Sequence, residues 1–177
     1  NGFLGKRFGT RFVTFVGPLA IALSFAQSMV LFFQMLEAEG NVLKEHLYTW
    51  IASGNFEAGI NFQVDQLSGL YLLIITGVGF LIHVYSVGYM NGESGYYRFF
   101  AYLNLFVFFM LILVLGDSFL LMFVGWEGVG LCSYLLIGYY FEKDSAAEAA
   151  KKAFLFNRIG DFGVLSAVML IFLSFGS

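Results

Sequence analysis

The chain has 177 residues, of which 59% are hydrophobic, 20% are aromatic and only 12% are charged, and its formal net charge is −3. Soluble domains are usually about half apolar and about one quarter charged, so this composition excludes an ordinary water-soluble globule and is typical of a membrane protein. There is no basic domain of the kind that binds nucleic acid. The single cysteine, Cys132, excludes an internal disulfide and an iron–sulfur cluster bound by this chain alone. The two histidines have no metal-ligand spacing, so no cofactor or metal is expected on this chain.

Five apolar stretches are long enough to cross a bilayer as helices, which takes about 20 residues. The first contains no charged residue, and its single proline, Pro18, lies near one end, where a helix tolerates proline best. The sequence therefore predicts an all-α membrane protein with about five transmembrane helices, as a fragment of a larger helical fold. In chain order, the stretches are residues 12–36, 67–90, 99–116, 119–141 and 153–175.

The long connection at residues 37–66 has the pattern of a β-hairpin. Apolar and polar residues alternate from Ile60 to Asp65, which is typical of a strand. Gly54 and Asn55 form a hairpin-turn signal. We therefore expect a β-hairpin that lies on one face of the membrane.

The other connections predict short turns and one early helix start. Residues 116–118 form a minimal turn between two antiparallel helices. Ser145 and Glu148 have the S-x-x-E spacing of a capping box, so the last helix is expected to begin near Ser145, before its membrane portion. The chain then divides into a first span with a basic end, the hairpin loop and a four-helix membrane region, at residues 1–36, 37–66 and 67–177.

Lysine and arginine residues outside the spans are strongly biased to one side of the predicted membrane. Seven fall on one face and only Lys44 falls on the other; Arg158 lies within a span and is not counted. Because cytoplasmic loops are enriched in these residues, we expect the seven to face the cytoplasm or its equivalent and the hairpin to face outward. The seven are Lys6, Arg7, Arg11, Arg98, Lys143, Lys151 and Lys152.

Glu127 interrupts the fourth span, in the stretch FVGWEGVGLCSYLLIG, close to the expected membrane midplane. It lies roughly 13 Å into the span at 1.5 Å per residue, within a hydrocarbon core about 30 Å thick. An acidic residue at that depth costs about 2.5–3.5 kcal/mol and is usually functional. Burial favours the neutral carboxyl group and a nearby cation favours the carboxylate, so Glu127 is a candidate proton carrier.

A structural interpretation of Glu127 also exists, in which its carboxyl group fixes helix packing through hydrogen bonds. Gly125, Gly128 and Gly130 surround it, and small residues let helices approach closely in lipid. The same glycines could also loosen the helix and admit water.

Three further titratable residues lie within the predicted spans. Arg158 and Asp161 are three residues apart and share a helix face, so they form either a self-neutralising ion pair or part of a hydrated path that biases neighbouring acids. His83 is a candidate proton relay because histidine titrates near neutral pH. A lone histidine near a helix end is more often a packing residue.

Four motifs together resemble the L-type subunit of respiratory complex I, which is called NADH dehydrogenase chain 5 in mitochondria. The two most specific are MFVGWEGVGLCSYLLIGYYF and KKAFLFNRIGDFG, and GVGFLIHVYSVGYM and YYRFFAYLNLF match in the expected order. The resemblance covers roughly residues 47–177, whereas the first forty residues are generic.

The resemblance implies a proton-translocating subunit of the membrane arm of NADH:quinone oxidoreductase. It implies that Glu127 is the family's membrane glutamate, which pairs with a lysine on a broken helix, and that Arg158 and Asp161 are its polar pair. The family's chains are longer and contain two inverted five-helix repeats, so that lysine would lie beyond Ser177.

The resemblance also implies where the rest of the chemistry resides. NADH, flavin, iron–sulfur clusters and quinone are expected on other subunits. The expected partners are other membrane-arm subunits, above all the neighbouring antiporter-like subunit, together with the lipid bilayer and protons. The implied location is a bacterial plasma membrane or the mitochondrial inner membrane.

Two other functions stay open. The large subunit of Mrp-type cation/proton antiporters shares this architecture, and co-purification with redox subunits would separate it from complex I. The third interpretation is a purely structural membrane subunit. Glu127, Arg158 and Asp161 argue against it, because scaffolding needs no charges within the membrane.

Overall fold

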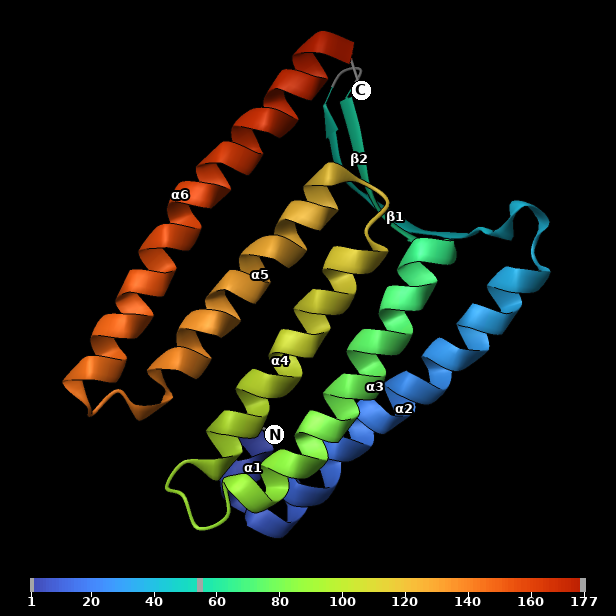
Figure 1. The fold of residues 1–177 in the computed structure, drawn as a ribbon. Coiled ribbons are helices and arrows are strands. Elements are labelled where there is room, and N and C mark those ends of the chain that lie inside the picture. The colour runs from blue at the N-terminus through green and yellow to red at the C-terminus, as the bar shows by residue number, and fades with distance from the viewer. Residues whose placement is uncertain (1, 54–55, 176–177) are drawn as a thin grey trace.

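The computed structural model describes residues 2–53 and 56–175, and its main feature is a row of five long helices (Figure 1). Each of the five is long and apolar enough to cross a membrane. The predicted all-α membrane architecture is therefore confirmed. The helices are α2 (Thr10–Glu37), α3 (Gln66–Tyr89), α4 (Tyr96–Leu115), α5 (Phe119–Ile137) and α6 (Asp144–Phe175).

The N-terminal region differs from the prediction in two ways. A short separate helix, α1 (Gly2–Phe8), precedes α2, and Gly9 joins them with a φ of 83°, a conformation that glycine adopts without strain. Because α2 begins already at Thr10, Pro18 lies two turns inside the helix rather than near its end. The expected placement of Pro18 was wrong, and its ring removes one backbone donor from the helix interior.

The predicted β-hairpin is present, and it contacts the turn between α4 and α5. Strands β1 (Leu43–Ser53) and β2 (Phe56–Val64) pair antiparallel, while the predicted turn residues Gly54 and Asn55 lie outside the described residues. The Asp117 amide donates to the Asn61 carbonyl at 3.1 Å, and Lys44 lies 3.6 Å from the Asp117 carboxylate. These contacts anchor the hairpin to one end of the helix row.

A capping box fixes the point where the hairpin ends and α3 begins. The Asp65 carboxylate accepts a hydrogen bond from the Ser68 amide at 2.7 Å, and the Asp65 amide donates to the Ser68 hydroxyl at 2.8 Å. The bond from the Ser68 amide, followed by that from its hydroxyl, holds the pKa of Asp65 below its usual value. The cap is therefore ionised at neutral pH, where it satisfies donors at the helix N-terminus.

The start of α6 agrees with the prediction in position but not in mechanism. The helix begins at Asp144 and runs for 32 residues, so it does start before its membrane portion. Ser145 lies inside the first turn, where it does not occupy the cap position that the S-x-x-E spacing predicted. The amides of Ala146 and Ala147 instead donate to the Lys143 carbonyl, each at 3.0 Å. Before α6, the chain passes through a short 3-10 helix, η2 (Gly138–Tyr140).

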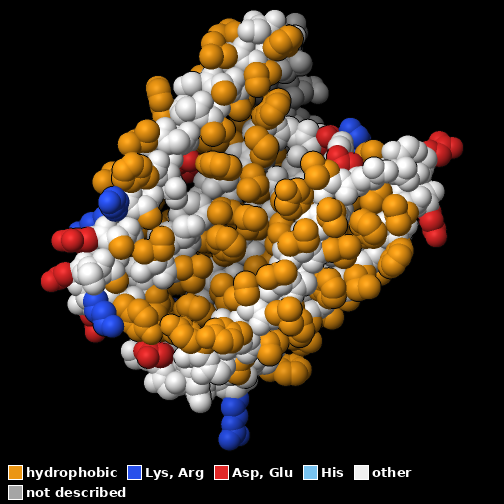
Figure 2. All heavy atoms as spheres, viewed as in Figure 1, with side chains coloured by type: hydrophobic (Ala, Val, Ile, Leu, Met, Phe, Trp, Pro, Cys, Tyr) orange, Lys and Arg blue, Asp and Glu red, His pale blue; other side chains and the backbone are white. Residues whose placement is uncertain are grey.

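The two ends of the helix row differ in charge as the sequence predicts. One end has α1, the first turns of α2, α4 and α6, and the α5–α6 connection, which together contain the seven cations. The hairpin lies at the other end (Figure 1). Between the ends, orange apolar side chains cover most of the visible surface (Figure 2). Leu155 and Phe162 of α6 are 62% and 76% exposed, as expected of helices whose apolar surface meets lipid or further helices.

Small apolar clusters hold the helices together at each end of the row. The cluster at the hairpin end joins Met35 of α2, Val64 of β2 and Leu72 of α3. The cluster at the basic end joins α2, the C-terminal end of α3, α4 and η2, and it consists of Val13, Met90, Tyr96, Phe100 and Tyr139. Between these clusters, three charged residues lie in the middle of the helices, Glu127 in α5 and Arg158 and Asp161 in α6.

Candidate functional site

Glu127 lies near the midpoint of α5 and forms a salt bridge to α6. Its carboxylate contacts the Arg158 guanidinium, and its side chain is 23% exposed. Arg158 also stacks over the Phe154 ring, with 4.7 Å between the guanidinium carbon and the ring centroid. The carboxyl group therefore faces the neighbouring helix at mid-depth in the span.

Arg158 is shared between two acids. Its guanidinium lies 3.5 Å from the Asp161 carboxylate, whose side chain is only 8% exposed. The other Asp161 oxygen accepts a hydrogen bond of 2.9 Å from the Trp126 indole N–H. We call these four residues, Trp126, Glu127, Arg158 and Asp161, the α5–α6 charge cluster.

The cluster contains two carboxyl groups and only one guanidinium. If both acids are ionised, the cluster has a net charge of −1, which is unfavourable in an apolar setting. Uptake of one proton makes the cluster neutral. One guanidinium therefore contacts two acids, one on each helix.

The sequence predicted three members of this cluster but not how they pair. Arg158 and Asp161 do form the expected pair along one helix, yet Arg158 also reaches Glu127 across the α5–α6 interface. The pair is therefore not purely local. Trp126 was missed, and the only sequence signal for it is that it precedes Glu127.

The glycines near Glu127 allow the close packing that the sequence predicted. A Cβ atom at Gly125 would lie 2.5 Å from the Leu113 backbone nitrogen in α4, and one at Gly128 would overlap the Phe109 ring. Gly130 faces α6, where a Cβ atom would lie 3.4 Å from the Asn157 side-chain amide. Small residues on α5 thus let the helix that contains Glu127 pack closely against both α4 and α6.

We expect Gly125→Ala to destabilise the protein by about 1–3 kcal/mol, because the added methyl group would meet backbone that cannot move aside. Gly163→Ala is the matched control, since no atom lies within 4 Å of the added methyl group. Thermal unfolding of the full-length protein in detergent measures both. Equal midpoints for the two variants would contradict the close packing.

His83 does not join the charge cluster. It is fully buried in α3, where its Nδ1 lies 2.7 Å from the Gly79 carbonyl oxygen, and its ring packs edge-on against Phe100 of α4. A carbonyl oxygen only accepts, so Nδ1 is the protonated nitrogen of this contact. These contacts are those of a packing histidine, and the relay role stays a prediction. Among the described residues, no group of three His, Cys, Asp or Glu side chains is placed to hold a metal ion.

Two family models match the chain in sequence. One, described as NADH-Ubiquinone oxidoreductase (complex I), chain 5 N-terminus, matches residues 50–100. The other, described as NADH:quinone oxidoreductase/Mrp antiporter, TM, matches residues 116–177, which contain the whole charge cluster. Together they match more than half of the chain.

The second description covers both NADH:quinone oxidoreductases and Mrp antiporters, and individual relatives decide between these two groups. A protein from Mycobacterium tuberculosis (strain CDC 1551 / Oshkosh), named NADH-quinone oxidoreductase subunit L, is 47% identical over 164 residues, which are 92% of this chain and 26% of the relative. The chain belongs to the subunit L family of NADH-quinone oxidoreductase. The resemblance found in the sequence motifs is therefore confirmed.

Other members of the subunit L family match a similar portion. The Escherichia coli (strain K12) protein is 51% identical over 131 residues, 74% of this chain and 21% of the relative. The Rickettsia felis protein is 41% identical over 177 residues, 100% of this chain and 27% of the relative. The chain thus spans about one quarter of the length of these subunit L relatives.

Proposed function

We propose that this chain contributes to proton translocation in the membrane arm of an NADH:quinone oxidoreductase and that Glu127 carries the proton. The observation that supports this role most strongly is the pairing of a mid-span glutamate with a shared arginine. An acidic residue at that depth costs free energy in a bilayer, and such residues are usually functional.

In the proposed mechanism, Arg158 moves between two arrangements. When Arg158 lies against Glu127, the carboxylate is stabilised and the proton is released. When Arg158 moves toward Asp161, Glu127 loses its cation and takes up a proton, because an unpaired charge in an apolar setting is unfavourable. Trp126 holds Asp161 in place as the alternative partner.

The energy for this movement comes from redox chemistry on other subunits. We propose that NADH, flavin, iron–sulfur clusters and quinone are bound there, and that neighbouring antiporter-like subunits transmit the coupling. The protein would then reside in a bacterial plasma membrane or a mitochondrial inner membrane. The test of this function is proton uptake measured beside quinone reduction in vesicles, with the variants described in the Discussion.

We also propose that the basic end of the helix row faces the cytoplasm or the matrix, where protons are taken up. Seven lysine and arginine residues at that end against Lys44 at the other support this orientation. A cysteine introduced as Ser145→Cys is expected to react with an impermeant maleimide only from the cytoplasmic side of sealed vesicles. Labelling from the outer side would contradict the orientation.

A further inference from the structure

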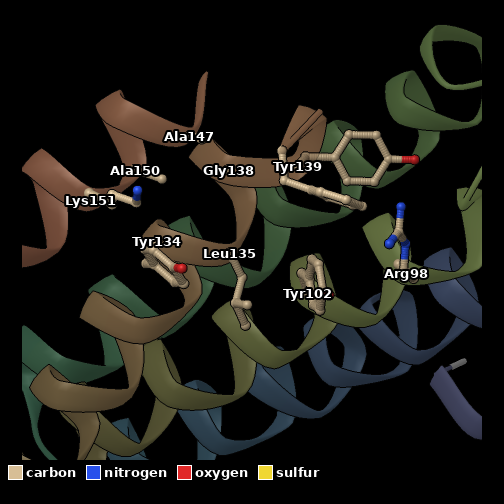
Figure 3. Close-up of a pocket in the computed structure, with 10 residues that line it drawn as sticks. Arg98, Tyr102, Tyr134, Leu135, Gly138, Tyr139, Ala147, Ala150 and Lys151 are labelled. Atoms are coloured by element: carbon tan, nitrogen blue, oxygen red, sulfur yellow. The ribbon is translucent and has the colours of Figure 1, made fainter. Parts of the chain in front are cut away.

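A pocket at the basic end of the helix row is not part of the charge cluster. Its volume is about 210 Å³, and it lies between the N-terminal end of α4, the end of α5 with η2, and the first turns of α6 (Figure 3). A water molecule occupies about 30 Å³ in the liquid, so the pocket has room for a small polar group and its hydration. The Tyr139 hydroxyl donates a hydrogen bond of 2.9 Å to the Ser94 carbonyl, which joins the η2 wall of the pocket to the α3–α4 loop.

Two cations from different helices line this pocket. Figure 3 shows Arg98 of α4 beside Tyr139 on one side and Lys151 of α6 on the other. Among the described residues, neither cation forms a salt bridge. Arg98 is half-buried, and its Nε is buried without a hydrogen-bond partner in the described part of the chain. Its guanidinium lies over two aromatic rings of the pocket, at 5.8 Å from the Tyr139 centroid and 5.3 Å from that of Phe141.

The charge of this end of the row also favours an anion. Its seven lysine and arginine residues exceed its four acids, which are Glu93, Glu142, Asp144 and Glu148. Arg98 on one side of the pocket and Lys151 on the other supply cationic donors for a phosphate group, which accepts several hydrogen bonds at once.

We infer that this pocket binds the phosphate headgroup of an anionic phospholipid. Phe141 and Tyr134 are 56% and 36% exposed at its edge, so the pocket opens onto the apolar surface of the helices. Leu135 and Ala150 add apolar wall next to the two cations. Aromatic rings at this level are typical of the membrane–water interface, and basic pockets between helices at that level take up lipid headgroups. A free phosphate ion would use the cations but not the apolar opening.

The test uses the full-length subunit in its intact complex, reconstituted into phosphatidylcholine nanodiscs. A trace of phosphatidylglycerol with a photoreactive diazirine in its headgroup is added, and mass spectrometry locates the labelled peptides after illumination. We expect labelling within residues 134–151 that unlabelled phosphatidylglycerol competes away and added phosphatidylcholine does not. Competition by inorganic phosphate as effective as that by the lipid would assign the pocket to free phosphate and overturn the lipid inference.

Charge variants separate this pocket from general attraction to a basic surface. Lys151→Gln is expected to reduce labelling several-fold, whereas Lys152→Gln removes the same charge from the next residue, outside the pocket, and is expected to change it little. Arg98→Lys keeps the charge but loses the fork of donors, and it guards against misfolding of Arg98→Gln. Equal labelling in Lys151→Gln and Lys152→Gln, or equal labelling by a photoreactive phosphatidylcholine, would contradict the inference.

Discussion

Glu127→Gln in the intact complex is expected to reduce proton translocation at least tenfold while the complex still assembles. Glutamine has nearly the same size and can still accept a hydrogen bond from Arg158, so helix packing is preserved. It cannot ionise, and a positioned proton-transfer group contributes about 10²–10⁴-fold to its step. Proton uptake and quinone reduction are measured in the same vesicles, so that loss of coupling is distinguished from loss of turnover.

Glu127→Asp is the control for this substitution. It keeps the carboxyl group and moves it by one methylene, so we expect a milder loss than in Glu127→Gln. If the carboxyl group served packing alone, the order would reverse, because glutamine fits the space better than aspartate. Assembled Glu127→Gln complexes that pump normally would rule out an obligatory proton-carrying role for this residue.

Arg158→Ala is expected to impair pumping strongly, and removal of Asp161 as well is not expected to restore it. Without the guanidinium, Glu127 and Asp161 both lose their cation, and both are favoured in the neutral form. In the double variant Arg158→Ala and Asp161→Ala, Glu127 still lacks the partner that releases its proton. The same vesicle assay compares the single and double variants.

The alternative for this pair makes the opposite prediction. If Arg158 and Asp161 only neutralised each other, the double variant would pump normally, because neither charge would remain to be compensated. Lys152→Ala is the matched control, since it removes an exposed cation from the same helix without touching the charge cluster. Normal pumping by the double variant would contradict the shared-arginine mechanism.

The helices and the two ends of the molecule could be predicted because they depend on composition along the chain. Long apolar stretches define the spans, and alternation at Ile60 to Asp65 defines a strand. The bias of lysine and arginine separates the two ends in the same way. These signals are local or summed over many residues, so they do not require knowledge of how the helices pack.

The contacts within the site depend on packing and could not be predicted in the same way. Arg158 reaches Glu127 only because α6 is rotated to present that residue to α5, and rotation is set by the interface. The Trp126 indole finds Asp161 for the same reason. The prediction for Ser145 failed for a local reason. The S-x-x-E spacing is present, but α6 begins at Asp144, one residue before Ser145, so Ser145 is not the cap.

The most direct test of the proton-carrying role of Glu127 is infrared difference spectroscopy of the intact complex in the carboxyl stretching region. Spectra are recorded as NADH drives turnover, in the wild type and in Glu127→Gln. The mechanism predicts a carboxyl band that changes with turnover in the wild type and is missing from the variant, because Glu127 gains and loses a proton. Identical difference spectra for the two proteins, with turnover equal in both, would contradict it.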